Sequence, residues 1–254
     1  MKLRLGAAVL TAALIPLTAL TGAAPARAGT VDVTPPEVGS CHQLTWHQVA
    51  GQSDARPSVP CTDEHDLVTT RVITFDTAPD WTSDELYYRV ARQCYRSIND
   101  FFGGDAKDVQ LSTYSTWFFY PTAAQQEAGA AWARCDLGLH TTTGRAHRDA
   151  LKQLPTDGQP TLGTAPLDDS IARCRLGGGG DFAVTTCDHA HRFRAVRAFR
   201  FPGATYPGLK RITHWSVHRC DHALGDDFGY FDAPTKFLWS AHRRFTICFT
   251  RTRS

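Results

Sequence analysis

Hydrophobic and polar positions follow two kinds of pattern along this chain. Stretches rich in β-branched and aromatic residues are typical of strands. Elsewhere apolar residues recur at three- and four-residue spacing around Cys94 and again around Cys220, which predicts two amphipathic helices. We expect strands at residues 68–75, 113–120, 131–139, 193–201, 228–232 and 244–250.

Each predicted helix has a cysteine on its apolar side. Thr82 and Glu85 have the spacing of a capping box, so the first helix should begin there and run to Phe102, before Gly103. Gly225 should end the second helix. The residues expected to surround Cys94 are Leu86, Tyr87, Val90, Ala91, Ile98 and Phe101, and those expected around Cys220 are Leu209, Ile212, Val217, Ala223 and Leu224.

The pattern itself recurs at an offset of 126 residues. Cys61 and His65 return as Cys187 and His191, each pair followed by a strand-like stretch. The sequence therefore predicts an α+β fold made of two tandem units, each a helix packed on a small, mainly antiparallel sheet. We expect the units at residues 29–139 and 173–254, joined by a linker at 140–172 with a short helix around 146–154.

The first residues have the layout of a secretory signal peptide. Lys2 and Arg4 precede an uncharged run, and Ala26-Arg27-Ala28 supplies a small-x-small cleavage site. We expect residues 1–28 to be removed and the mature chain to be secreted or associated with the cell envelope. Retention of the apolar run as a membrane anchor is the alternative.

Charge differs strongly between the two halves of the mature chain. Residues 29–172 contain 10 basic and 19 acidic residues, whereas residues 173–254 contain 14 and 6. The halves are therefore expected to dock through complementary faces. The alternative is that Arg192, Arg194 and Arg200, alternating along one strand face, bind an anionic envelope polymer or an acidic partner. The overall charge gives no reason to expect nucleic-acid binding.

All eight cysteines follow the signal segment, as expected for a protein with disulfides in an oxidising compartment. If bonds stay within units and follow one rule, three pairings remain. We expect the pairing Cys41–Cys61, Cys94–Cys135, Cys174–Cys187 and Cys220–Cys248. A zinc site is a weak alternative because no Cys-x-x-Cys occurs.

Short motifs resemble the septum-formation domain family of actinobacterial envelope proteins. The first half carries Gly-Ser-Cys41, Val-Pro-Cys61-Thr-Asp-Glu-His65, Tyr-Pro121-Thr and Ala-Trp132-Ala-Arg-Cys135. The second half is similar to a degenerate copy, with Cys187-Asp-His-Ala-His191 and Arg244-Phe-Thr-Ile-Cys248. The resemblance implies a role at the envelope or the division septum and no established catalytic activity.

His65 and His191 each lie four positions after a cysteine, at the entrance to a strand. We interpret them as structural residues whose rings hydrogen-bond backbone groups of a disulfide-tied turn. No Gly-x-Ser-x-Gly or His-Glu-x-x-His motif accompanies them, so an enzyme is not the favoured interpretation. A secreted hydrolase would need His65 or His191 beside an activated serine or aspartate.

His214, His218 and His222 are spaced four apart and should form a solvent-facing ridge on the second helix. Histidines at this spacing can share a zinc or copper ion, which makes an extracytoplasmic metal-binding module an alternative function. A solvated polar face explains the same pattern, so no cofactor is predicted. The favoured function is a non-catalytic binding protein whose partner is an envelope protein or an anionic cell-wall polymer.

Overall fold

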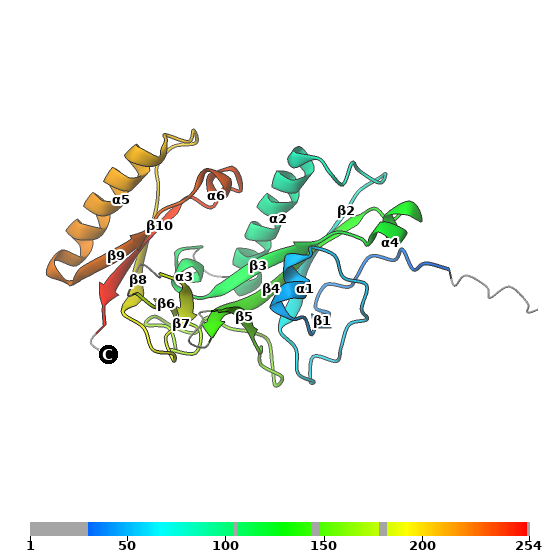
Figure 1. Cartoon of the computed structure of the whole chain (residues 1–254), viewed down its shortest axis with the longest axis horizontal. Coiled ribbons are helices and arrows are strands. Elements are labelled where there is room, and N and C mark those ends of the chain that lie inside the picture. The colour runs from blue at the N-terminus through cyan, green and yellow to red at the C-terminus, as the bar shows by residue number, and fades with distance from the viewer. Residues whose placement is uncertain (1–29, 104–105, 144–147, 178–181, 253–254) are drawn as a thin grey trace, which may run out of the picture. The chain divides into compact units, whose positions relative to one another are not determined.

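The computed structural model describes residues 30–103, 106–143, 148–177 and 182–252, and the expected signal segment lies outside them. From Val31 onward the chain forms one compact unit. It contains two antiparallel sheets and a few helices, so the predicted α+β class is confirmed (Figure 1). Among the described helices, none has both the length and the apolar character that a membrane span requires.

The first sheet carries a long helix on one face. Its strands lie in the order β1 (Cys41–His42), β2 (Leu67–Thr74), β4 (Trp132–Thr143) and β3 (Tyr114–Phe119), and β5 (Arg148–Lys152) pairs with β4. Helix α2 (Asp84–Phe102) packs on one face, and α1 (Trp46–Ala50) lies on the other, where Val49 contacts Leu67 and Phe119. The short helices α3 (Ala106–Leu111) and α4 (Ala123–Glu127) precede and follow β3.

The second sheet is built in the same way. Its order is β7 (Val184–Thr186), β6 (Arg173–Arg175), β8 (Phe193–Arg200), β10 (Phe245–Arg251) and β9 (Phe228–Asp232). Helix α5 (Leu209–Leu224) packs against β9 and β10. The 3-10 turn η1 (Gly225–Asp227) follows α5, and the short helix α6 (Lys236–Ser240) follows β9.

Strand order and register agree between the sheets. The orders β1-β2-β4-β3 and β6-β8-β10-β9 correspond strand by strand. A bulge also recurs: Thr70 is the extra residue opposite Cys135 and Asp136, and Val196 is the extra residue opposite Cys248 and Phe249. Because all described residues from Val31 on belong to one compact unit, the division into two tandem units stays a prediction.

The four predicted disulfides are all formed. Cys94–Cys135 attaches α2 to β4, and Cys220–Cys248 attaches α5 to β10, in both cases from a fully buried position. The other two bonds, Cys41–Cys61 and Cys174–Cys187, tie the loops that precede β2 and β8. The described part of the chain contains no free cysteine.

Two details of the helices differ from expectation. The N-cap of α2 is Ser83, whose hydroxyl accepts the Leu86 N–H, while the Thr82 hydroxyl donates to Asp80. On α5, Leu209, Val217 and Ala223 are exposed instead of buried. The buried stripe of α5 is narrower than that of α2 and consists of Ile212, Ser216 and Cys220.

The stretch expected to be a linker is part of the fold. Strand β4 continues to Thr143, and residues 148–152 form β5 where a short helix was expected. β5 forms because its backbone pairs antiparallel with the extended end of β4, the strand that precedes it, and this pairing overrides the helical pattern expected at 146–154. Further along, Leu154, Leu162 and Leu167 enter a core cluster that also contains Leu139 and Cys174.

Candidate functional site

A polar cleft lies on the face of the first sheet opposite α2. Its volume is about 390 Å³, within the range of small-molecule sites. The walls come from the extended segment before β1, from the loop after α1 and from α4. Residues lining it include Glu37, Ser40, His42, Asp54, Arg56, Gln125, Trp132 and Arg134.

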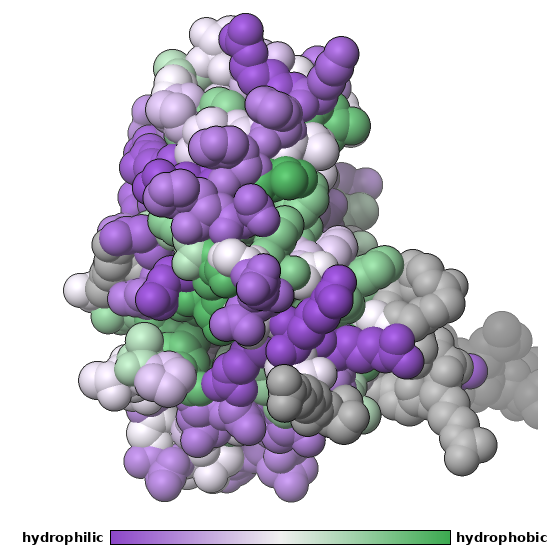
Figure 2. Space-filling view, turned by 90° about the vertical axis from the view of Figure 1, so that its left-hand side faces the viewer, coloured by the Kyte–Doolittle hydropathy of each residue, from purple (hydrophilic) through white to green (hydrophobic). Residues whose placement is uncertain are grey.

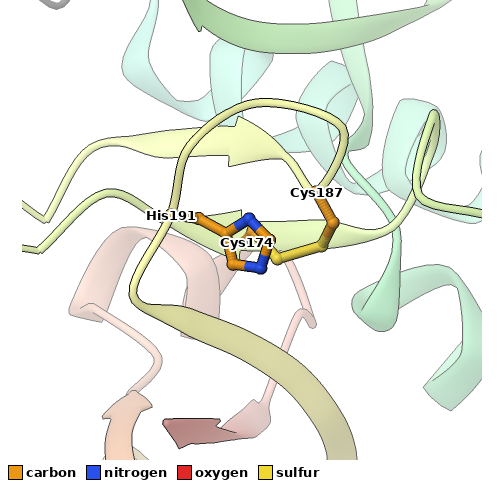
Figure 3. Close-up of side chains that lie close together, drawn as sticks. All are labelled: Cys174, Cys187 and His191. Carbon is orange, nitrogen blue, oxygen red and sulfur yellow. A yellow bond between two sulfur atoms is a disulfide. The ribbon is translucent and has the colours of Figure 1, made fainter. Parts of the chain in front are cut away.

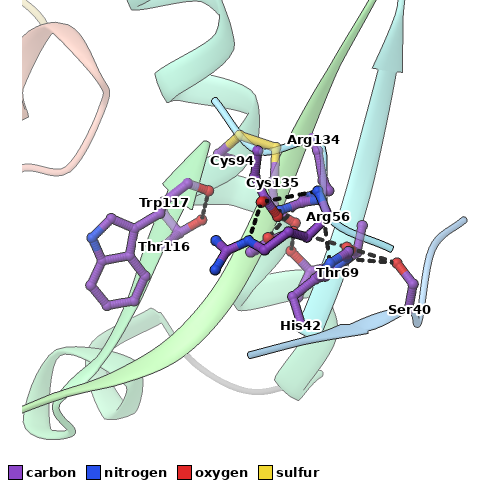
Figure 4. Close-up of polar contacts among 12 residues, drawn as sticks. Ser40, His42, Arg56, Thr69, Cys94, Thr116, Trp117, Arg134 and Cys135 are labelled. Carbon is purple, nitrogen blue, oxygen red and sulfur yellow. Dashed lines mark hydrogen bonds and ion pairs between the residues drawn. A yellow bond between two sulfur atoms is a disulfide. The ribbon is translucent and has the colours of Figure 1, made fainter. Parts of the chain in front are cut away.

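Arg134 is the central charge beneath this cleft. Its guanidinium lies over the Phe119 ring, 4.6 Å from the centroid, and the side chain is 2% exposed. Nε lies 2.9 Å from Asp136 Oδ2, and Nη2 lies 3.4 Å from Asp54 Oδ2. Arg56 Nε donates to Asp54 Oδ1 at 2.8 Å, which extends the network towards solvent (Figure 4). Two arginines and two aspartates therefore meet at one place.

His42 completes the network as a neutral donor. Arg134 Nη1 lies 3.4 Å from His42 Nδ1, and because arginine only donates, this contact favours the tautomer with the proton on Nε2. In this tautomer Nε2 donates to Ser40 Oγ at 3.1 Å or to Thr69 Oγ1 at 3.3 Å, and the Ser40 hydroxyl donates to the Glu37 carbonyl at 2.7 Å. His42 so protonated is a donor to Ser40 and does not accept its proton.

Burial shifts the protonation of two groups in opposite directions. Desolvation, together with the charge of Arg134, lowers the pKa of His42 to about 4. Desolvation raises the pKa of Asp136 to about 6, against the attraction of Arg134 and a hydrogen bond from the Thr69 hydroxyl. At neutral pH the network is balanced in charge, and it gains a positive charge as the pH falls below about 6.

The second sheet has apolar side chains at the positions that correspond to Arg134, Asp136 and Thr69. Flanking the disulfide cysteine, Arg134 and Asp136 of β4 correspond to Ile247 and Phe249 of β10. Opposite them, Thr69 corresponds to Ala195, and these three apolar residues form a buried cluster of their own. The fold therefore does not require charges at these three positions, and the ion pair on this face of the second sheet, Arg175–Asp232, lies elsewhere, with the guanidinium 5.9 Å from the Phe249 ring centroid.

His65 and His191 make the backbone contacts expected of structural residues. His65 is buried, and its Nδ1 lies 2.9 Å from the Asp63 carbonyl oxygen. His191 Nδ1 lies 2.8 Å from the His189 carbonyl oxygen. Within the described residues, neither ring hydrogen-bonds a serine hydroxyl or a carboxylate, so the geometry required for the hydrolase is not formed there.

Among the described residues, one group of three potential metal ligands has its ligand atoms within 4.8 Å of one another: Cys174, Cys187 and His191 (Figure 3). Both sulfur atoms belong to a disulfide. Since the thiolate is the form of cysteine that ligates metals, the oxidised cluster lacks two of its three ligands. The arrangement therefore places a histidine against a disulfide.

The histidine ridge lies on α5 as predicted, and His214, His218 and His222 are all exposed. Their ring nitrogens do not form a three-ligand group in the described structure. Figure 2 views the molecule from the α5 side and shows apolar surface between hydrophilic side chains on this face. Metal binding by the ridge stays a prediction.

The expected basic face of β8 is not formed. Arg194 pairs with Thr250 and Arg200 with Phe245, positions that point to opposite sides of the uninterrupted strand β10. The bulge at Val196 causes this change of side. Arg194 is in addition ion-paired to Asp169, while Arg192 and Arg200 are exposed.

The two halves of the chain contact each other partly through ion pairs. Arg194–Asp169 joins a base of the second half to an acid of the first, as expected, but Lys152–Asp188 has the opposite arrangement. Other contacts are uncharged on one side: Arg243 donates to Gln110 at 2.7 Å, and its guanidinium lies 5.5 Å from the Tyr95 ring centroid. The halves therefore dock through hydrogen bonds and apolar packing as well as ion pairs.

The sequence interpretation missed the network around Arg134. A strand that reads Trp132, Ala, Arg134, Cys, Asp136 alternates in polarity, and such alternation normally indicates a solvated face. The loop after α1 covers this face, and no local pattern encodes that contact. The available signal was a pair of opposite charges two residues apart, flanking a buried cysteine.

No protein-family model, no curated protein and no solved structure matches this chain. The resemblance to the septum-formation domain family therefore stays a prediction. The four disulfides are consistent with an extracytoplasmic protein.

Proposed function

We propose that this chain is an extracytoplasmic, non-catalytic binding protein that takes a polar component of the cell envelope in the cleft above Arg134. The observation that carries the proposal is the contrast between the sheets. The second sheet fills the corresponding positions with Ile247 and Phe249, whereas the first buries charges beside an open cleft.

Energetics support a functional reason for the charges. Replacing a buried ion pair by apolar residues of similar volume is often neutral or stabilising. The second sheet has the apolar residues Ile247 and Phe249 at the positions of Arg134 and Asp136, so the fold does not depend on charges there for its stability. Fixed charges that line a cleft do serve recognition, because they are held in place before a ligand arrives.

A binding role agrees with the protonation of the site. Ser40 and His42 have their protons committed to fixed partners, which suits hydrogen bonding to a ligand better than proton transfer. The family resemblance, on its short motifs, favours septum formation or another envelope process as the setting. A cell-wall polymer or an envelope protein would be the partner.

The test compares the oxidised mature chain with a variant that copies the second sheet, Thr69→Ala with Arg134→Ile and Asp136→Phe. Co-sedimentation with isolated cell-wall peptidoglycan, before and after removal of its anionic polymers, should show about tenfold weaker binding for the variant, the loss of roughly one good interaction of 1.4 kcal/mol.

His218→Ala is the matched control, since it changes an exposed residue on α5 and leaves the cleft intact. It should sediment like the wild type. Equal binding by the wild type and the triple variant, with both folded, would remove the cleft from the proposal. Lack of binding by the wild type to either wall preparation would remove the cell-wall ligand.

A further inference from the structure

A second cleft, on the other side of the loop after α1, has a different chemical character. Its volume is about 350 Å³. It lies where the loop after α1, the start of α2 and the short helix α4 meet. The lining residues are Gly51, Gln52, Ser53, Trp81, Thr82, Ser83, Asp84, Tyr87, Tyr120, Pro121, Ala123 and Gln126, and they include no lysine or arginine.

Aromatic rings form one wall of this cleft. The half-buried Trp81 indole lies 5.4 Å from the Tyr120 ring and 5.9 Å from the Phe75 ring, measured between centroids. Rings packed in this way are held in place while part of their surface remains available. Tyrosine and tryptophan combine an apolar face with a polar tip, a combination that suits ligands with both properties.

The polar groups around the rings are amides and hydroxyls. Gln126 Nε2 donates to the Pro121 carbonyl at 2.7 Å, which fixes this amide, and the Gln52 side chain lies near the Tyr87 hydroxyl. The buried Tyr120 hydroxyl has no hydrogen-bond partner among the described residues, although such groups are normally paired. Burial raises the pKa of Tyr120 to about 12, so this hydroxyl keeps its proton.

Backbone geometry also fixes the cleft. Gln52 has a left-handed φ of 52°, which is uncommon for a residue other than glycine. Its carbonyl accepts the Tyr120 N–H at 3.0 Å, which holds the loop after α1 against the end of β3. The two walls are therefore joined at the residues that line the cleft.

The corresponding place in the second sheet is filled. α4 and α6 both begin after a threonine N-cap, and the fourth residue after the cap is Gln126 in one and Trp239 in the other. Trp239 is 4% exposed and packs on Phe201 and Tyr206, with ring centroids 5.2 Å and 5.7 Å away. Tyr120, the residue after β3, corresponds to Ala233 after β9. Phe75, the counterpart of Phe201, is covered by Trp81 instead, and the first sheet has Gln126 in the lining of the cleft where the second has the buried Trp239.

We infer that this cleft binds a neutral sugar ring of an oligosaccharide, with the ring stacked on Trp81 and its hydroxyl or amide groups bonded to Gln52, Gln126 and the Tyr120 hydroxyl. The lack of basic residues, with Asp84 in the lining, disfavours an anionic ligand. Apolar ring faces and uncharged, directional polar groups are what a pyranose needs.

The experiment titrates the oxidised mature chain with two soluble neutral trisaccharides, triacetylchitotriose and maltotriose, by calorimetry and tryptophan fluorescence. One of them should bind, and the acetylated probe shows whether amide groups contribute. Gln126→Trp, which imitates Trp239, should weaken binding at least tenfold by filling the cleft, without removing any core residue. Tyr120→Phe should weaken binding about fivefold, the loss of one hydrogen bond.

The triple variant of the polar cleft, Thr69→Ala with Arg134→Ile and Asp136→Phe, is the control and should bind the trisaccharide normally. This control separates the two proposals, because each can fail while the other holds. The inference is overturned if neither trisaccharide binds the wild type, or if folded Gln126→Trp and Tyr120→Phe variants both bind like it.

Discussion

Arg134 illustrates how the surroundings of a residue determine the free-energy cost of burying its charge. Alone it is a cation removed from water, but Asp54, Asp136 and the face of Phe119 compensate the lost hydration. Ile247 needs none of these partners at the corresponding position. The charged residues stabilise the fold only when all of them are present, so their contributions to the free energy of unfolding should be strongly coupled.

Arg134→Ile alone should therefore destabilise the protein by about 3–5 kcal/mol, because it leaves Asp136 buried without its partner. The triple variant with Thr69→Ala and Asp136→Phe should recover most of this loss. Urea unfolding of both variants and of Asp136→Phe measures the coupling. Additive effects would mean that the network does not act as a unit.

The shifted pKa values predict opposite pH dependences for two residues. The pKa of Asp136 is raised from 3.8 to about 6, so its contribution to stability is greatest at low pH and falls as the pH rises from 4 to 6. The pKa of His42 is lowered from 6.5 to about 4, so its contribution rises between pH 4 and 6.5. The two effects oppose each other in the wild type.

Asp136→Asn should therefore gain stability relative to the wild type as the pH rises from 4 to 7, by about 2 kcal/mol. His42→Gln should lose relative stability over the same range. Urea unfolding at several pH values from 4 to 7 checks both. Variant curves parallel to the wild-type curve would show that neither group is shifted.

The repeated order of the cysteines predicted the disulfides, and the chemistry of a tight turn predicted the backbone contacts of His65 and His191. The sequence did not predict the arrangement of Arg192, Arg194 and Arg200, because the bulge at Val196 reverses the alternation. Nor did the sequence reveal the network around Arg134 or the second cleft, which Trp81 lines. Both depend on a loop that folds over the sheet from elsewhere in the chain.

At the scale of elements, hydrophobic periodicity located six of the ten described strands and both long helices to within a few residues, whereas β1, β6 and β7 were not predicted. Strand β9 was predicted with its observed bounds, and α2 ends at Phe102 because Gly103 adopts a left-handed φ of 58°. β5 is an exception set by its partner, the end of β4, and α5 is one because its buried stripe is narrower than predicted.

The disulfides that attach the long helices should matter more than those that tie the loops. Cys94–Cys135 spans 41 residues and Cys174–Cys187 spans 13. Loop-closure entropy gives about 4 and about 3 kcal/mol for bonds of these lengths. Paired Cys→Ala variants, compared by thermal unfolding after mass analysis of the remaining bonds, should show this order. The reverse order would contradict it.

At the scale of the whole molecule, the two sheets share a core. One cluster contains Val109 and Leu139 from the first half, Leu154 and Leu167 from the intervening stretch, and Cys174 from the second. Thr141 Oγ1 also lies 3.4 Å from Thr185 Oγ1, where β4 approaches β7. The repeat in sequence therefore predicted corresponding strands, helices and disulfides in the two halves, but gave no information on these contacts.

We accordingly expect the mature chain to unfold in a single transition, with equal calorimetric and van't Hoff enthalpies. A fragment of residues 29–139 should lack stable tertiary structure, because it loses β5 and Leu154, Leu162 and Leu167 from the core. Scanning calorimetry and near-UV circular dichroism test both statements. Two separate transitions, or a folded fragment, would favour independent units.

The recurrent bulge makes the chain tolerant of a change of length at two particular codons. Loss of Thr70 from the gene would leave Thr69 and Arg71 opposite Asp136 and Cys135 without an extra residue, so Ile73 would keep its place beside α2, and loss of Val196 would likewise leave Phe199 on its present side of β8. Loss of one residue from the exposed stretch 155–159 shifts no strand. In-frame deletions of one residue should therefore be tolerated in that loop and at both bulges, and purged in the central strands β4 and β10, where the remaining residues would change faces.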